Sequence, residues 1–62
     1  MNGYNVAQYP RGLASLTHEK GKYVVIIYKH SDKGTLPVAR KEFDFKSKAR
    51  EWREMNARAL LQ

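Results

Sequence analysis

The sequence predicts a small α+β domain in which a three-stranded antiparallel sheet packs against one C-terminal helix. Residues 22–29 are dense in β-branched and aromatic side chains, which favour strands. Turn-forming glycines flank this segment at Gly21 and Gly34. After about residue 45 the apolar side chains recur at helical spacing instead. A chain of 62 residues has room for one such domain.

The three strands are expected at about 13–17, 22–29 and 35–43. Alternation puts two apolar sets on opposite faces of the second strand: Tyr23, Val25 and Ile27 on one, and Val24, Ile26 and Tyr28 on the other. Pro37 cannot donate to a β-ladder, so the third strand is expected to be an edge strand or to begin at this residue. Residues 1–10 are polar and are predicted to form a flexible arm, which leaves 11–62 as the folded domain.

The helix is expected to be capped by Asp44 or Ser47, whose side chains accept hydrogen bonds from free backbone N–H groups. Trp52 is predicted to be the central core residue of this helix, packed against Val25 and Ile27. The predicted apolar stripe consists of Ala49, Trp52, Met55 or Asn56, Ala59 and Leu60.

The formal net charge of the chain is +6. Arg11 and Glu19 cancel within residues 1–19, so the excess lies in residues 20–62, which hold eleven basic and five acidic residues. Such an excess attracts polyanions, although small domains also carry it for solubility. No apolar run approaches the ~20 residues of a membrane helix, and no signal peptide is evident. Together with the absence of cysteine, this favours a cytoplasmic protein that makes no membrane contact.

Catalysis, metal binding and cofactors are not expected. Neither histidine has a second ligand at metal-binding spacing. Ser15 and Thr17 share a strand face while His18 points to the other, so they do not form a nucleophile and its base. Glu42 and Asp44 fit a surface charge and a helix cap better than an acid pair. We therefore expect that the protein is not an enzyme.

Several short motifs follow the β-β-β-α order: Tyr9-Pro10-Arg11-Gly12, Gly21-Lys22-Tyr23, Lys33-Gly34, Phe43-Asp44, and Ala49 three residues before Trp52. Over roughly residues 9–61 the chain resembles the arm-type DNA-binding domain at the N-terminus of phage and transposon tyrosine integrases. That domain is related to the DNA-binding domain of plant Apetala-type transcription factors. The resemblance implies a module for DNA recombination or regulation, with its sheet in the major groove of duplex DNA.

The resemblance and the charge pattern together assign DNA contacts to eight residues: Arg11, Lys22, Ile26, Tyr28, Lys29, Lys33, Arg40 and Lys41. Some positions depart from the family pattern, because Ala14 and Leu16 stand where the family often has basic residues, and Ile26 replaces a charged reader.

These departures make the outward face of the sheet apolar, which favours an alternative function. The protein would then be a small interaction module, for instance a phage-encoded inhibitor, docking on a protein partner through Val24, Ile26 and Tyr28. RNA binding is a weaker prediction, because we expect no pairing of aromatic residues on adjacent strands.

Overall fold

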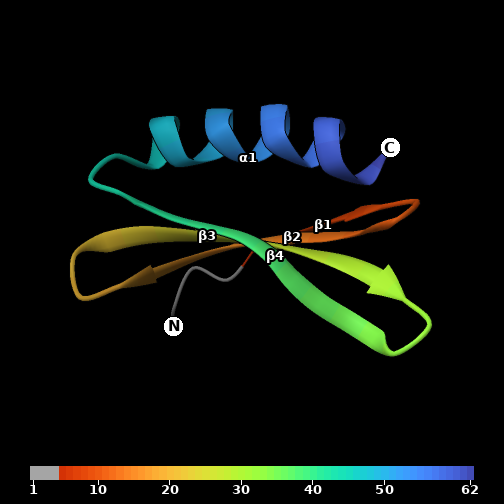
Figure 1. Cartoon of the computed structure of the whole chain (residues 1–62). Helices are drawn as coiled ribbons and strands as arrows, with labels where there is room; N and C mark the ends of the chain where they lie inside the picture. The colour runs from red at the N-terminus through yellow and green to blue at the C-terminus, as the bar shows by residue number, and fades with distance from the viewer. Residues whose placement is uncertain (1–4) are drawn as a thin grey trace.

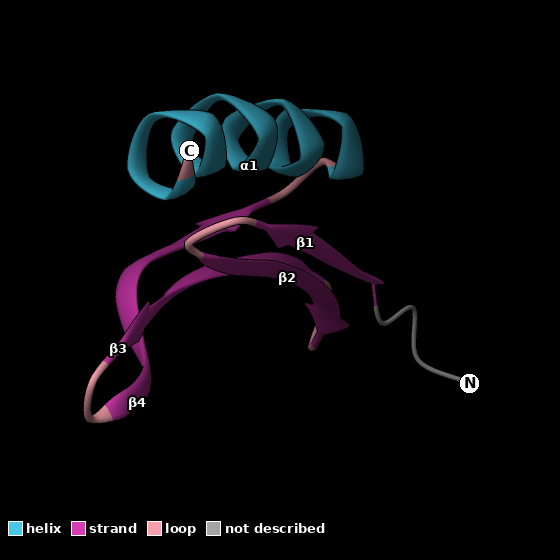
Figure 2. Cartoon of the chain, turned by 90° about the vertical axis from the view of Figure 1, so that its right-hand side faces the viewer, coloured by secondary structure: helices cyan, strands magenta, loops and turns pink. Residues whose placement is uncertain are grey.

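The computed structural model describes residues 5–62, which form four strands and one helix. The elements are β1 (Asn5–Tyr9), β2 (Gly12–Glu19), β3 (Lys22–Ser31), β4 (Gly34–Phe43) and α1 (Lys46–Leu61). The strands form an antiparallel meander in the order β1-β2-β3-β4. Helix α1 lies across one face of this sheet, so the molecule has two layers (Figures 1 and 2). The predicted α+β class and C-terminal helix are confirmed, but the sheet has four strands rather than three.

The additional strand, β1, comes from the segment that was predicted to be a flexible arm. It pairs with β2 through the turn at Pro10 and Arg11, with Asn5 opposite Leu16 and Tyr9 opposite Gly12. Its five residues show little apolar alternation, so pairing with β2 rather than local pattern makes this segment a strand. Residues 1–4 of the predicted arm lie outside the described residues.

The two hairpin turns after β2 and β3 depend on backbone conformations with positive φ. Lys20 (φ 50°) and Gly21 (φ 77°) form the two-residue turn between β2 and β3, whose left-handed conformation matches the twist of the strands. Gly34 (φ 116°) begins β4, and the Ser31 hydroxyl closes this turn by donating to the Gly34 carbonyl at 2.8 Å. The structure thus confirms turns at both predicted glycines.

Strand β4 forms one edge of the sheet, as Pro37 predicts. The register shifts between Ile27 and Tyr28, because Ile27 lies opposite Ala39 whereas Tyr28 lies opposite Pro37. Val38 is therefore an extra residue with no partner on β3, and it follows directly after Pro37, which fits the preference of proline for edge strands and bulges.

The core lies between α1 and the two internal strands. Its buried side chains are Ala14, Leu16, Val25, Ile27, Ala49, Ala57 and Leu61. The predicted helical stripe is confirmed at Ala49, but in the second half of the helix it has the wrong phase, because Met55, Ala59 and Leu60 are exposed. Trp52 is also not the central residue. The alanines let α1 lie close to the sheet, and the indole packs half-buried at the margin against Phe43.

The N-terminus of α1 has no side-chain cap, so both predicted caps are wrong. The N-cap residue is Phe45, in an extended conformation, while Asp44 forms an ion pair with Lys22 on β3 instead. Among residues 5–62 there is no helix long and apolar enough to cross a membrane.

The C-terminus of α1 is tied to the β1–β2 turn. The backbone N–H of Arg11 donates to the Leu61 carbonyl at 3.1 Å, and the Arg11 carbonyl accepts from the N–H of His30 at 2.8 Å. Gly12 follows, and here the backbone of β2 lies so close to Tyr28 on β3 and to the Leu61 side chain that a Cβ atom would overlap them. The helix is thus held at both ends, by the β4–α1 connection and by this turn.

Candidate nucleic-acid interface

The eight residues predicted to contact DNA do not form one surface. We call the sheet face turned away from α1 the outer face. Ile26 and Tyr28 lie there, because their neighbours Val25 and Ile27 belong to the core. Arg40 lies opposite Ile26 on the same face. Lys22 lies on the same face, because it is four residues before Ile26 on the same strand and side chains alternate between the faces.

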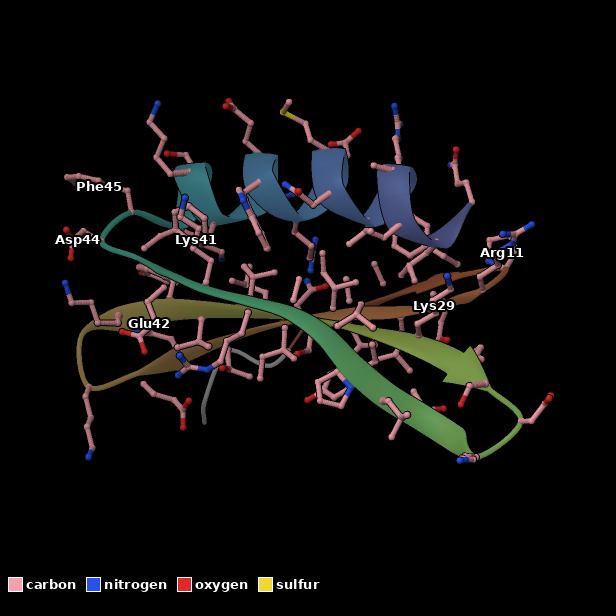
Figure 3. All side chains as sticks on the ribbon, in the orientation of Figure 1. Arg11, Lys29, Lys41, Glu42, Asp44 and Phe45 are labelled. Carbon is pink, nitrogen blue, oxygen red and sulfur yellow. The ribbon has the colours of Figure 1, made fainter. Side chains whose placement is uncertain are left out.

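The other four predicted residues lie elsewhere. Lys41 is opposite the core residue Val25, so it is on the helix side of the sheet, and Figure 3 shows it directed toward α1. Lys29 is opposite Gly12 and lies with Arg11 at the end of the sheet beneath the C-terminal turn of α1 (Figure 3). Lys33 is in the β3–β4 turn. Arg40 and Lys41, adjacent in sequence, thus lie on opposite faces.

The basic residues of the outer face are neutralised by neighbouring carboxylates. Arg40 pairs with Glu42 at 2.9 Å, and Lys22 pairs with Asp44. The hydrogen bond and the charge of Asp44 raise the pKa of Lys22 above its ordinary value, and Glu42 adds to this effect. While Asp44 is ionised, the stability that this pair gives the folded state is therefore present below about pH 10.5, the ordinary lysine pKa, and is lost as the pH rises through the raised pKa of Lys22.

The outer face is also less open than the sequence predicts. The side chains of Val24, Ile26 and Tyr28 do point away from α1, as expected from the alternation. Val24, however, is only 3% exposed, and Ile26 and Tyr28 are half-buried. A docking surface made of these three residues therefore presents little free apolar area.

The net positive charge of the molecule lies on the helix side, which we define as α1 together with the residues that flank it from the sheet and the β1–β2 turn. Eight basic residues belong to it: Arg11, Lys29, Lys41, Lys46, Lys48, Arg50, Arg53 and Arg58. Its acidic residues are Glu51 and Glu54, so the helix side carries +6. The other charged residues are four basic and four acidic, and their net charge is zero: Lys20, Lys22, Lys33, Arg40, Glu19, Asp32, Glu42 and Asp44.

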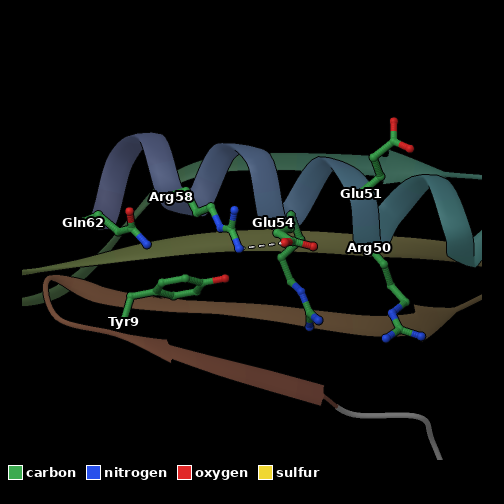
Figure 4. A pocket seen from close by; sticks show the side chains of 7 residues that line it. Tyr9, Arg50, Glu51, Glu54, Arg58 and Gln62 are labelled. Atoms are coloured by element: carbon green, nitrogen blue, oxygen red, sulfur yellow. Dashed lines mark ion pairs between the residues drawn. The ribbon is translucent and has the colours of Figure 1, made fainter.

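A groove of about 320 Å³ runs between α1 and the end of β1 on this helix side. Arg50, Arg53 and Arg58 line it together with Tyr9 (Figure 4). Arg58 forms an ion pair with Glu54 at 3.0 Å, and Arg53 donates to the side-chain oxygen of Asn5 at 3.1 Å. Arg50 points from α1 toward the sheet (Figure 4). From the sequence, Glu54 and Arg58 are expected to pair at i,i+4 spacing, as they do, but none of these arginines was assigned to a DNA contact, because their position relative to the sheet depends on the phase of the helix.

Aromatic side chains form a row across the sheet near the N-terminus of α1. His18 and Tyr23 stack with ring centroids 4.3 Å apart, and Tyr23 lies opposite Phe43 on β4. Phe43 in turn contacts Trp52 at 5.8 Å. The expectation that no aromatic residues pair on adjacent strands is therefore wrong. From the sequence alone, the register of β4 against β3, which places Tyr23 opposite Phe43, is uncertain by one residue.

Residues 5–62 contain no cluster of three histidine, aspartate or glutamate side chains placed to hold a metal ion. Comparisons of the chain with protein-family models, curated proteins and solved structures found no significant match. The resemblance to integrase arm-type domains stays a prediction from the sequence.

Proposed function

We propose that this protein binds DNA through its helix side, using lysine and arginine side chains to contact phosphate groups. The single observation that carries the proposal is the division of charge. The helix side carries the whole net charge of +6, while the rest of the described molecule is neutral. A surface of one sign attracts a polyanion over several ångströms and orients the molecule as it approaches.

This orientation differs from the one that the resemblance implies. A sheet that enters the major groove needs basic or polar side chains on its outer face, where phosphates and base edges would surround it. The two outer-face cations, Lys22 and Arg40, each have a carboxylate partner already. DNA binding by that face would require breaking these pairs, whereas the helix side has a cationic excess available. A cysteine-free, DNA-binding chain would be expected in the cytoplasm.

Arg40 and Lys41 provide a matched test of the two orientations, because they are adjacent, exposed and on opposite faces. Arg40→Gln and Lys41→Gln remove the same charge. We expect Lys41→Gln to weaken binding to a short labelled duplex on the order of tenfold at about 0.05 M salt, the loss of one phosphate contact. Arg40→Gln should leave the affinity nearly unchanged. Fluorescence anisotropy measures both affinities.

The possible outcomes separate the two surfaces. If Arg40→Gln alone weakens binding, the outer face contacts DNA and the helix-side proposal is wrong. If the unaltered protein does not bind duplex DNA even at low salt, the DNA function itself is wrong. Thermal unfolding of both variants provides the folding control.

A further inference from the structure

Phe45 is the most exposed large apolar side chain among residues 5–62, with 68% of its surface accessible. It is the N-cap residue of α1, a position that favours Ser, Thr, Asp or Asn because their side chains satisfy free N–H groups. The backbone carbonyl of Phe45 accepts a hydrogen bond from the N–H of Ala49 at 3.1 Å, but its side chain makes no capping hydrogen bond and does not belong to the core. Figure 3 shows it directed away from both layers at this end of the molecule. Its side chain therefore has no evident role in the fold.

The surroundings of Phe45 contain further aromatic rings. Phe43, two residues earlier, joins the row that runs through Tyr23 to His18, and the imidazole of His18 is exposed. These rings lie at the end of the sheet from which the β4–α1 connection leaves, because Phe43 is the last residue of β4 and pairs with Tyr23, which in turn pairs with His18. This end of the molecule therefore combines exposed and half-buried aromatic surface.

Lysine side chains lie at the same end of the molecule as these aromatic rings. The Nζ atom of Lys41 lies over the Phe43 ring, 5.5 Å from its centroid. Lys46 and Lys48 are exposed in the first turn of α1, which contains no acidic residue. Within residues 5–62 no ion pair joins these three lysines to a carboxylate. Glu42 and Asp44, the acidic residues on either side of Phe43 in the chain, are paired with Arg40 and Lys22.

Aromatic rings beside free cations are the arrangement by which proteins hold unpaired nucleotides, since any base has a face that can stack and any phosphate is anionic. We infer that this end of the molecule binds an unpaired nucleotide, with the base stacked on Phe45 and the phosphate held by Lys41 and Lys46. The inference rests on the proposed function and deepens it. It predicts that the preferred ligand is a duplex with a single-stranded extension rather than a blunt duplex.

The test compares one blunt duplex with the same duplex carrying a short deoxyuridine or uridine overhang. We expect the overhang to tighten binding roughly tenfold, the effect of one stacked base. Phe45→Ala should remove this preference without changing the affinity for the blunt duplex, and Phe45→Trp should keep it. Met55→Ala is the matched control, because Met55 is 65% exposed and lies on the solvent side of α1, away from the aromatic row. A fluorescent base analogue in the overhang should be quenched by the unaltered protein and not by Phe45→Ala.

The outcomes distinguish a failure of this inference from a failure of the proposed function. Equal affinity for blunt and overhanging duplexes would overturn the inference, while DNA binding through the helix side would stand. Loss of the preference in Met55→Ala as well as Phe45→Ala would also overturn it, because general apolar contact would then be responsible. Absence of binding to every ligand at low salt would overturn the proposed function and the inference together. A stronger preference for a uridine than for a deoxyuridine overhang would support the inference and identify RNA as the source of the unpaired nucleotide, because the two differ only in the 2′-hydroxyl group.

Discussion

At the scale of single residues, Gly12 shows how a position that looks like a simple bend is determined by packing. The sequence marks it as part of a turn, next to Pro10 and Arg11. In the structure it is buried, and an added Cβ would overlap the carbonyl oxygen of Tyr28. The same Cβ would lie 2.8 Å from Cδ2 of Leu61 at the end of α1. Glycine is therefore required because strand and helix approach so closely here.

We expect Gly12→Ala to destabilise the protein by at least about 1–3 kcal/mol, because the backbone of β3 cannot move aside as a flexible side chain would. For a domain of this size that is a large fraction of a total stability of roughly 3–9 kcal/mol. The urea midpoint of unfolding measures the change. Gly21→Asn is the control, since no atom lies within 4 Å of a Cβ at position 21 and asparagine tolerates positive φ. Equal stability of Gly12→Ala and the unaltered protein would show that the close approach is wrong.

At the scale of elements, α1 contacts the sheet through small side chains. Ala49 and Ala57 are fully buried, whereas Ala59, two residues further along, is exposed. The phase of the helix decides this difference, and the sequence pattern indicated the opposite for Ala59. The same phase turns Arg50 toward the sheet and leaves Trp52 at the margin beside Phe43.

Substituting leucine at two alanines tests this phase. Ala57→Leu should destabilise the protein by about 1–3 kcal/mol, because the larger side chain has no space between α1 and the sheet. Ala59→Leu should change the free energy of unfolding by no more than about 0.5 kcal/mol, as is usual for exposed positions. Chemical denaturation of the two variants measures both values. The reverse order would restore the apolar stripe predicted from the sequence.

At the scale of the whole molecule, the helix side and the remaining surface differ in net charge. The helix side carries +6 and the remaining charges cancel. Two ion pairs on the sheet contribute to this division by neutralising Lys22 and Arg40. A molecule divided in this way should approach a polyanion with α1 foremost.

The salt dependence of DNA binding should reflect this asymmetry. If four or five phosphates are contacted, the slope of log affinity against log salt concentration should be near −4, because each contact contributes about −0.9. The double variant Lys46→Gln/Lys48→Gln should flatten the slope by about two units. Lys20→Gln/Lys33→Gln removes the same net charge from outside the helix side and should leave the slope unchanged. Equal flattening by both double variants would mean that net charge, rather than its position, determines binding.

The elements whose signals are local could be predicted from the sequence. The β-branched run of β3, the turns at Gly21 and Gly34, the edge position of β4 with Pro37 and the presence of a C-terminal helix all depend on neighbouring residues alone. Adjacent residues of a strand always point to opposite faces, so the sequence also implied that Arg40 and Lys41 could not share one surface.

Whether Arg40 or Lys41 lies on the same side of the sheet as α1 depends on the tertiary structure. That choice depends on the register of β4, which the extra residue Val38 shifts. The strand β1 likewise exists through its pairing with β2, and the helix phase through the fit of Ala49 and Ala57 against the sheet. Register and phase are properties of contacts between distant segments. For that reason the fold class was predictable, while the charge division and the aromatic row that carry the proposed function were not.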